Sequence, residues 1–589
     1  MPGKPVNSTR TAIRLVRPTG GDSLSAWPGI APVLERIYRA RGISDPSELD
    51  LSLQALSVPA SLPGVSQAVT TLVEHRKASV LVVGDYDTDG ASATALAVLG
   101  LRELGWEQVR YRVPNRFKHG YGLTPALVHE ILEDPPSLLL TVDQGTTSID
   151  GIEQARASGL SVVVTDHHLA GARLPPASAI VNPNLPGSRF PARGLSGVGV
   201  LFYLLIALRA ALRERQTLPD GNMTLARWLD LVALGTMADL VPLDRDNRIL
   251  IAQGLRRIRA GECRPGIRAL LAVSRREPDR VTEEDLAFSL APRLNAAGRL
   301  DEMGLGVECL LTEDPAQALE MARRLDDINH RRRELQGATE EEAAGFLRDG
   351  EGEDPDQLAC VLYDPDWHLG ILGLIASRFK ERVHRPVFAL ALGEDGRIRG
   401  SARSIPGIHI RDLLVAMDAQ DPTLFHQFGG HAMAAGLTLA RDVGVEDFKH
   451  QLAVVLEPYR ALCLGDREIR TDGELAVGEL NRETAGFLDN GGPWGSGFPK
   501  PLFDGRFILD AVDRLTERHF RIRLRDPQGG GVFVAVGFPP IPERFEAGTV
   551  SHYLFYPTIN RYRGSETFEL RIVSQFDPDR VELVERDKF

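Results

Sequence analysis

The stretch "SVLVVGDYDTDGASATALAVLGLRELG", residues 79–105, contains a short apolar run, an acidic turn and then a run of small and apolar residues. β-Branched residues dominate the first run, which favours a strand, and the Ala-rich run favours a helix. Asp85, Asp87 and Asp89 lie in the turn between them. Because three carboxylates this close repel one another, the turn indicates a bound cation or a shared proton.

Strands and helices continue to alternate after this stretch. Short apolar runs recur as "VRYRV" (109–113), "SLLLTV" (137–142) and "SVVVT" (161–165). This alternation predicts an α/β fold with a parallel sheet covered on both faces. Such sheets bind ligands outside the carboxyl ends of their strands. Asp143 and Asp166 follow two of these strands, so we expect them to share one site with the acidic turn.

The chain has 589 residues, which predicts three to five domains. Met321, Ile328 and Leu335 recur at seven-residue spacing and predict a long helix that connects two lobes. A Gly/Asp-rich linker is expected over 349–357, followed by a second α/β unit, and alternating strands after residue 465 suggest a small β-barrel. The expected divisions are 1–50 (tail and leading helix), 51–311 (catalytic α/β domain), 312–349 (connecting helix), 350–464 (second α/β lobe) and 465–589 (barrel).

Composition excludes several classes of protein. The four cysteines are scattered singly, which argues against a zinc ribbon or a disulfide framework and fits a reducing cytosol. No apolar run reaches the roughly 20 residues of a membrane span. The net charge of −12 argues against indiscriminate binding of duplex DNA. Lys4, Arg10, Arg14 and Arg17 are interpreted as a disordered basic tail in preference to a transit peptide.

Acidic and imidazole side chains are concentrated in four short segments. These are the acidic turn, Asp143, "TDHH" (165–168) and "GTMADLVPL" with Asp239. About four carboxylates and one imidazole carry excess negative charge, which two divalent cations would neutralise. Oxygen-rich ligation with one histidine suits Mn²⁺ or Mg²⁺. Two such ions about 3.5–4 Å apart can hold the attacking water and the leaving oxygen of a phosphoryl displacement.

"GDYDTDG", "TVDQG", "VVVTDHH" with "IVNPN", and "GTMADLVPL" resemble, in order and spacing, the motifs of the DHH phosphoesterase superfamily. "PNRFKHGYGL" (114–123), "GLSGVGVLFYLL" (194–205), "APRLNAAGRL" (291–300) and "GGHAMAAG" (429–436) are similar to those of its RecJ family of bacterial single-strand-specific 5′→3′ exonucleases. The resemblance covers roughly residues 30 to 575. It implies a DHH core, a DHHA1-type second lobe and an OB-fold barrel.

The resemblance also implies a set of catalytic residues. Asp143 would bridge two metal ions, Asp85 and Asp166 would orient the ligands, and His168 would contact the scissile phosphate or transfer a proton; a packed, hydrogen-bonded histidine is the alternative for His168. The implied metal ligands are Asp87, Asp89, Asp143, His167 and Asp239. An activated water would then attack phosphorus in line, with Mn²⁺ preferred or Mg²⁺.

Basic and small residues of two later segments are expected to bind the substrate. A glycine-rich entry to a helix favours an anion, and Ser377 and Arg378 lie on that helix. Ser401, Arg403 and His431 are the favoured phosphate contacts of the second lobe, and a solvated basic face is the alternative. In "PRLNAAGR", interleaved small residues allow a close approach to a backbone, so substrate contacts are also expected at Arg293, Asn295 and Arg299.

The barrel segment departs from the family pattern at one place. In "GPWGSGFPKPLF" (492–503), Trp494 replaces an expected Phe and Phe498 an expected Asn. Phe507, Phe520 and Phe533 are either stacking platforms or barrel core, and alternation favours core. Arg521 and Arg523 share one face of a strand and would follow a nucleic-acid backbone.

The function implied is that of a cytoplasmic exonuclease that degrades single-stranded DNA from its 5′ end in DNA repair and recombination, including end resection, mismatch repair and base-excision repair. The family also suggests a single-strand-binding protein and a repair helicase as partners, and no membrane. Three alternatives remain. A DHH-type pyrophosphatase would have His where Val83 stands. An oligonucleotide or cyclic-dinucleotide phosphodiesterase would lack the barrel, and an inactive replication scaffold would lack the filled ligand positions.

Overall fold

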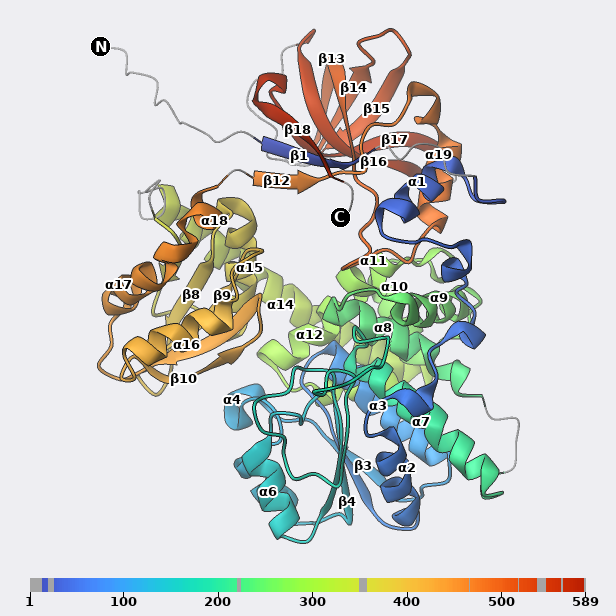
Figure 1. Cartoon of the computed structure of the whole chain (residues 1–589), viewed down its shortest axis with the longest axis vertical. Helices are drawn as coiled ribbons and strands as arrows, with labels where there is room; N and C mark the ends of the chain where they lie inside the picture. Colours follow the sequence, from blue (N-terminus) through green and yellow to red (C-terminus); the bar gives the residue numbers. More distant parts are fainter. Residues whose placement is uncertain are drawn as a thin grey trace.

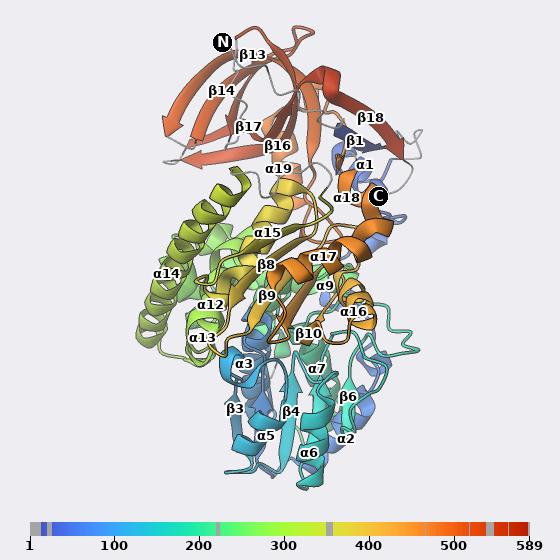
Figure 2. The ribbon, with the colours of Figure 1, turned by 90° about the vertical axis from the view of Figure 1, so that its left-hand side faces the viewer.

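The computed structural model describes residues 13–19, 26–219, 224–348, 357–465, 467–516, 519–537, 547–562 and 565–586. These residues form two α/β lobes and a β-barrel (Figure 1). The barrel lies at one end of the long axis and the first lobe at the other, with the second lobe beside them (Figures 1 and 2). The predicted fold class is therefore confirmed: a parallel-sheet core, a connecting helix, a second α/β lobe and a C-terminal barrel.

The sheet of the first lobe has five parallel strands in the order β3-β2-β4-β5-β6. Val80 and Val82 pack into the core on the side of α3 (Thr88–Glu103) and α7 (Gly197–Glu214), whereas Leu81 and Val83 pack on the side of α5 (Pro125–Ile131) and α6 (Ile149–Ala157). Burial on both faces explains why the strands are apolar throughout. The strands are β2 (Val80–Val83), β3 (Val109–Arg112), β4 (Leu138–Val142), β5 (Ser161–Thr165) and β6 (Ala179–Val181).

Further helices cover this core. α8 (Leu229–Asp239) contacts α3, α7 and α9, and its residues 229–237 are buried. None of the described helices is long and apolar enough to cross a membrane. The other helices of this region are α2 (Val65–Glu74), α4 (Arg116–His119), α9 (Arg245–Arg259), α10 (Pro265–Val273), α11 (Glu283–Asp285), α12 (Ala291–Leu300) and α13 (Gly304–Leu311), with a π-helical turn at Leu286–Leu290. By contrast, α1 (Pro32–Ala40) packs against α19 (Arg482–Asn490) next to the barrel (Figure 1).

A single long helix, α14 (Pro315–Arg348), connects the lobes. Its N-terminal half packs on α10, α12 and α13, and Ala343 near its other end belongs to a core of the second lobe. Of the three predicted heptad positions, Met321 packs against the first core and Ile328 is buried, but Leu335 is 42% exposed. The seven-residue pattern therefore ends where the helix leaves the first lobe. Most of the predicted linker, residues 349–356, lies outside the described residues.

The second lobe has a mixed sheet in the order β10-β11-β9-β8-β7, in which β7 and β8 are parallel and the other pairs antiparallel. α15 (Leu372–Val383) covers one face, and α16 (Ile410–Gln420) and α17 (Val445–Leu456) cover the other. α18 (Arg460–Leu464) follows. The strands are β7 (Cys360–Tyr363), β8 (Val387–Leu392), β9 (Ile398–Arg403), β10 (Phe425–Gly430) and β11 (Ala434–Leu439).

The C-terminal strands close into a barrel in the order β13-β14-β15-β17-β16. Phe507 is buried in it, and Phe520 and Phe533 are partly buried against the same core, so the core interpretation of these rings holds. Arg521 and Arg523 are exposed on β14. The strands are β13 (Phe503–Thr516), β14 (His519–Arg525), β15 (Val532–Gly537), β16 (Val550–Tyr562) and β17 (Ser565–Phe576), and α19 (Arg482–Asn490) precedes them.

Part of the predicted N-terminal tail is a strand. β1 (Ile13–Pro18) lies between β12 (Arg467–Arg470) and β18 (Val581–Arg586) and pairs with both in parallel. The prediction of a disordered tail is therefore wrong for Arg14 and Arg17, while Lys4 and Arg10 lie outside the described residues. Arg17 bonds to the buried Asp504 of the barrel. At least one basic side chain of this segment, Arg17, therefore contacts the barrel.

Candidate metal centre

Side chains from four separate segments meet at the carboxyl edge of the first sheet. The segments are the loops after β2, β4 and β5 and the last residue of α8. Three groups of side chains each have ligand atoms within 4.8 Å of one another. They are Asp85–Asp87–Asp143, Asp89–His167–Asp239 and Asp143–His167–His168. The structure therefore brings together every residue predicted to hold or contact metal, and it also places Asp85 directly in the cluster.

The acidic turn is held by backbone hydrogen bonds at two helix N-termini. Asp87 caps α3, where its Oδ1 accepts a hydrogen bond of 2.9 Å from Gly90 N. Asp89 accepts hydrogen bonds of 2.7 Å from Gly197 N and 3.0 Å from Val198 N, at the start of α7. These N–H groups favour negative charge. They therefore hold the two carboxyl groups close together.

Asp143 lies at the centre of the cluster in a strained backbone conformation. Its φ is 61°, which is uncommon for a residue other than glycine. A β-carbon at position 197 would overlap the Asp143 carboxylate, so Gly197 is needed for this close packing. Asp143 Oδ1 lies 3.3 Å from His167 Nε2, and Asp239 Oδ2 lies 3.4 Å from the same nitrogen. Ligand atoms from three loops thus converge on one point.

Asp166 fixes the two histidines that follow it. Its carboxylate accepts hydrogen bonds from Thr146 N, His167 N and the His168 ring Nδ1, the last at 2.7 Å. Although burial favours the neutral acid, the bond from His168 holds the pKa of Asp166 below its ordinary value. Asn182 and Asn184 donate hydrogen bonds of 2.9 and 2.7 Å to the carbonyls of His168 and His167. This network orients both imidazoles.

Burial and mutual repulsion shift the pKa values of the other carboxyl groups upward. Burial and Asp87 raise the pKa of Asp85 to about 8. Burial and neighbouring carboxylates raise the pKa of Asp89 and of Asp239 to about 7, and that of Asp143 well above its ordinary value. The cluster therefore lacks compensating positive charge.

The residues fit divalent cations. Asp143 Oδ1 and His167 Nε2 are buried, and neither has a hydrogen-bond partner. Buried polar atoms are normally paired, so two unpaired ligand atoms at the centre of a carboxylate cluster indicate a bound ion. Carboxylate oxygens with a single imidazole are the donor set that Mn²⁺ and Mg²⁺ accept.

His168 joins the cluster to Tyr121 and to the second lobe. Despite burial, which favours the neutral ring, the hydrogen bond to Asp166 raises the pKa of His168 to about 9. Tyr121 Oη lies 3.2 Å from His168 Nδ1, and the His431 ring of the second lobe lies 5.2 Å from the His168 ring. Tyr121 was not singled out from the sequence, although it lies in the quoted "PNRFKHGYGL" segment.

Four arginines gather between the lobes beside this cluster. Burial and the charges of Arg116, Arg403 and Arg332 lower the pKa of Arg299 to about 9. Arg403 donates to Ser401 Oγ at 3.2 Å, and a β-carbon at position 373 would lie 2.8 Å from its Nη2. The start of α15 therefore adjoins Ser401 and Arg403. Guanidinium groups this close indicate a site for an anion.

Sequence reasoning identified only part of this arginine group. Arg299, Arg403 and Ser401 were predicted, whereas Arg116 and Arg332 were missed. Arg116 stacks on Tyr86 with 4.2 Å between its Cζ and the ring centre. Arg332 comes from the connecting helix, and its Nε is buried without a hydrogen-bond partner. Arg116 lies in the quoted "PNRFKHGYGL" segment, whereas nothing in the pattern of the sequence distinguishes Arg332 from the many other arginines.

The other predicted substrate residues have different surroundings. Arg293 is buried and forms an ion pair of 2.9 Å with Asp326 of α14. Asn295 Oδ1 accepts hydrogen bonds of 2.8 and 2.9 Å from the N and Oγ1 of Thr88, inside the acidic turn. Ser377 and the exposed Arg378 lie on α15, where Arg378 faces Glu340 at 4.0 Å. Arg293 and Asn295 thus contact protein groups.

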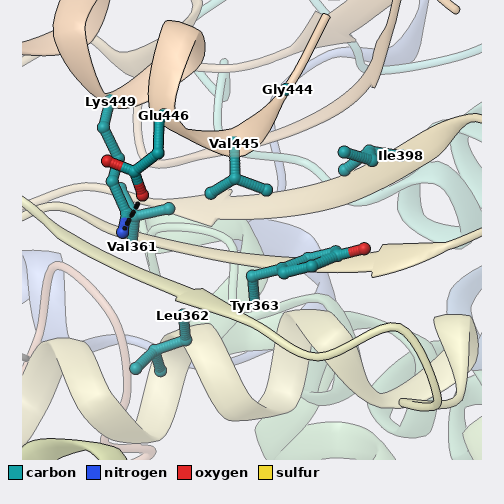
Figure 3. Close-up of a pocket in the computed structure, with 8 residues that line it drawn as sticks. All are labelled: Val361, Leu362, Tyr363, Ile398, Gly444, Val445, Glu446 and Lys449. Carbon is teal, nitrogen blue, oxygen red and sulfur yellow. Dashed lines mark hydrogen bonds and ion pairs between the residues drawn. The ribbon is translucent and has the colours of Figure 1, made fainter.

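A separate hollow lies in the second lobe (Figure 3). It has a volume of about 510 Å³ and is bordered by Val361, Tyr363, Ile398 and Val445, with the Lys449–Glu446 ion pair at its edge. It contains none of the predicted site residues. The candidate functional site is therefore the cluster between the lobes and not this hollow.

The fold and the cluster together define a class of metal-dependent phosphoesterase. The model described as the DHH family, N-terminal domain, matches residues 79–236, the DHHA1 domain matches 356–457, and the RecJ OB domain matches 471–574.

Curated relatives identify the family within this class. The single-stranded-DNA-specific exonuclease RecJ of Dickeya dadantii is 47% identical over 87% of this chain and 90% of its own, and that of Escherichia coli is 43% identical over 92% and 95%. The crystal structure of Thermus thermophilus RecJ with Mn²⁺ covers 94% of this chain and 77% of its own, with 31% identity and a TM-score of 0.76. The chain belongs to the RecJ family.

Proposed function

We propose that this protein is a hydrolase that degrades single-stranded DNA from the 5′ end. The observation that carries the proposal is the position of the carboxylate–imidazole cluster next to an arginine group shared by both lobes. The close relatives are single-stranded-DNA-specific exonucleases, and structures of the Thermus relative contain Mn²⁺ or Mg²⁺. We infer divalent cations, Mn²⁺ preferred or Mg²⁺, as cofactors.

The proposed ligands are Asp87, Asp89, Asp143, His167 and Asp239. Two of the three groups of ligand atoms contain these residues and Asp85, with Asp85, Asp87 and Asp143 in one and Asp89, His167 and Asp239 in the other. Asp143 belongs to the first group and lies 3.3 Å from His167 of the second, which supports a bridging role. Two bound cations would supply an activated water and would stabilise charge on the leaving oxygen.

The protein's own residues would orient and neutralise the substrate. His168 carries a proton on a ring that Asp166 fixes by hydrogen bonding, so it can donate to a phosphate oxygen. Asp166 keeps this imidazole in one orientation, and Asp85 would orient the ligands of the acidic turn. We expect in-line displacement because that is the geometry a two-metal site supports.

The arginine group is the proposed pocket for the terminal 5′ phosphate. Arg299 and Arg403, with Ser401 and the start of α15, would hold a phosphate beside the metal centre, and His431 lies over His168. A terminal phosphate carries more charge than an internal phosphodiester, so it gains more from clustered guanidiniums. This arrangement gives the direction of digestion. Arg521 and Arg523 on the barrel would follow the incoming strand.

The function is tested by digesting single strands labelled at either end. We expect release of label from the 5′ end first, with Mn²⁺ or Mg²⁺ but not with chelator, and no digestion of a blunt duplex. Equal rates on circular and linear single strands would overturn the end pocket. A preference for dinucleotides over long strands would favour the short-oligonucleotide phosphodiesterase instead.

The biological setting is a further part of the proposal. A nuclease of this specificity suits end resection, mismatch repair and base-excision repair, with a single-strand-binding protein and a repair helicase as partners. The described cysteines are all free thiols, which is consistent with work in a reducing cytoplasm. Co-purification of these partners with the tagged full chain tests this setting. Co-purification that survives nuclease treatment would show direct protein contact, and co-purification lost on nuclease treatment would show contact through DNA.

A further inference from the structure

Two exposed leucines border the metal-binding cluster. Leu169 directly follows His168 and is 56% exposed, and Leu240 directly follows Asp239 and is 58% exposed. Neither belongs to any of the apolar cores of the described residues. His168 and Asp239 each have a ligand atom within 4.8 Å of one in His167, so both leucines directly follow residues of the same cluster. An apolar edge thus adjoins a strongly charged site.

Leu240 has a backbone conformation that is unfavourable for leucine. It ends α8 in the left-handed region, with φ 56° and ψ 26°. Glycine is the usual residue at this kind of helix end, and another residue there costs about 1 kcal/mol. Leucine gains little in return from burial, because most of its side chain faces solvent. A strained, exposed apolar side chain beside a reactive centre points to a role in binding.

We propose that Leu240 and Leu169 form an apolar contact for the base and sugar of a nucleotide next to the scissile phosphate. The inference rests on the proposed function and adds a subsite to it. The cluster and the arginine group account for phosphate groups only. Every base has an apolar face, and in a single strand that face is free to be contacted. Leucine forms no side-chain hydrogen bonds with the edges of a base. The contact therefore needs a base to be present but does not distinguish one base from another.

The variant Leu240→Gly separates this role from folding. Glycine relieves the backbone strain, so we expect the thermal unfolding midpoint to stay the same or rise. We expect kcat/KM on single-stranded DNA to fall about tenfold, the order expected for loss of an apolar contact. Gln216→Gly is the matched control: Gln216 is exposed, has φ 54° and follows the far end of α7. It should leave activity unchanged.

A substrate without a base completes the test. Single strands that carry an abasic residue on one side of the first scissile bond should be cut about tenfold more slowly by the wild-type protein. The Leu240→Gly variant should cut abasic and normal strands at similar rates, because the contact is already lost. Leu169→Ala, which removes an exposed side chain, should behave in the same way.

The outcomes are distinct. If the wild type cuts both strands equally, or if the variant slows both by the same factor, the apolar contact does not exist. If the wild type fails to cut any single strand with Mn²⁺, the proposed function itself is wrong.

Discussion

Asp143 shows how the surrounding structure stabilises an unfavourable residue. Its carboxylate is buried among other carboxylates, and its backbone has a φ of 61°. Gly197 allows the close approach, and the helix N-termini hold the neighbouring Asp89 in place. Such strain persists only where the rest of the fold fixes it, and it is typical of reactive sites.

Removal of central ligands should abolish hydrolysis without unfolding the protein. We expect Asp143→Ala and His167→Ala to lower kcat by at least about a thousandfold, the scale of losing a central electrostatic contact. The alanine at 143 also relieves repulsion, so the metal-free protein should be no less stable. Calorimetric titration with Mn²⁺, circular dichroism and a nuclease assay check this. Asp134→Ala, an exposed carboxylate paired with Arg110, is the control. Nuclease activity retained in either variant would contradict the ligand assignment.

The end pocket is tested at Arg403. Loss of one charged contact to phosphate costs roughly 1.5–3 kcal/mol, so Arg403→Ala should raise KM for 5′-phosphorylated strands by about tenfold or more. Arg399→Ala is a matched control on the same strand, because Arg399 pairs with Asp395 on the surface. Equal effects of the two substitutions would show that the pocket does not recognise the terminal phosphate.

At the scale of elements, α12 supports the acidic turn. Small residues in its sequence predict a close approach to a backbone, and the structure identifies that backbone as the acidic turn itself. A β-carbon at position 298 would overlap the carbonyl oxygen of Tyr86, and Asn295 bonds to Thr88 in the same turn. The substrate roles predicted for Arg293 and Asn295 stay predictions, but their contacts favour a role in positioning.

A substitution in α12 tests this support. Gly298→Ala should destabilise the protein by about 1–3 kcal/mol, the usual cost of overpacking, and should weaken Mn²⁺ binding because the acidic turn must move. Denaturant unfolding and calorimetry measure the two effects. Gly304→Ala is the control, since a β-carbon there meets nothing within 4 Å. Unchanged Mn²⁺ affinity in Gly298→Ala would show that α12 does not set the ligand geometry.

At the scale of the molecule, the barrel adds a surface remote from the metals. Arg521 and Arg523 are exposed on β14, so replacing both by alanine should weaken binding of long single strands and lower the salt dependence of that binding. Cleavage of a dinucleotide should not change, because it cannot reach the barrel. Fluorescence anisotropy at several salt concentrations tests this. If the double variant lost activity equally on long strands and on the dinucleotide, the two arginines would not act by holding the distant part of the strand.

A buried network joins the barrel to the N-terminal strand. Asp504 accepts hydrogen bonds from Arg17 and from His552 Nε2, the latter at 2.7 Å. Burial alone would raise the pKa of Asp504, but the bonds from His552 and Arg17 lower it below its ordinary value. A carboxyl whose folded pKa is depressed stabilises the fold above its unfolded pKa, about 3.9, and loses that contribution as pH falls through the folded value.

Asp504→Asn should therefore be less stable than wild type at pH 7, by about 3–5 kcal/mol, because the largely buried charge of Arg17 loses its counterpart. The difference should shrink as pH falls below about 3.9. Urea unfolding across this pH range measures it. If the difference in unfolding free energy between wild type and variant did not change with pH, the carboxylate charge would not be what stabilises the contact.

The sequence predicted the parts of the site that follow from local pattern. Asp85, Asp143 and Asp166 each come directly after a predicted strand, and parallel strands end at one edge of their sheet. It did not predict β1, because a basic six-residue segment gives little strand signal until its partners β12 and β18 are known.

By itself, the amino-acid sequence determined the order of lobes and barrel and the acidic cluster, since strand periodicity and residue spacing are local properties. Only the tertiary structure decided which arginines share an anion site: Arg116, Arg299 and Arg403 lie far apart in the chain, and Arg332 comes from the connecting helix. The physical reason is that arginines resemble one another in sequence. Their roles depend on which charges the folded chain brings within a few ångströms of them.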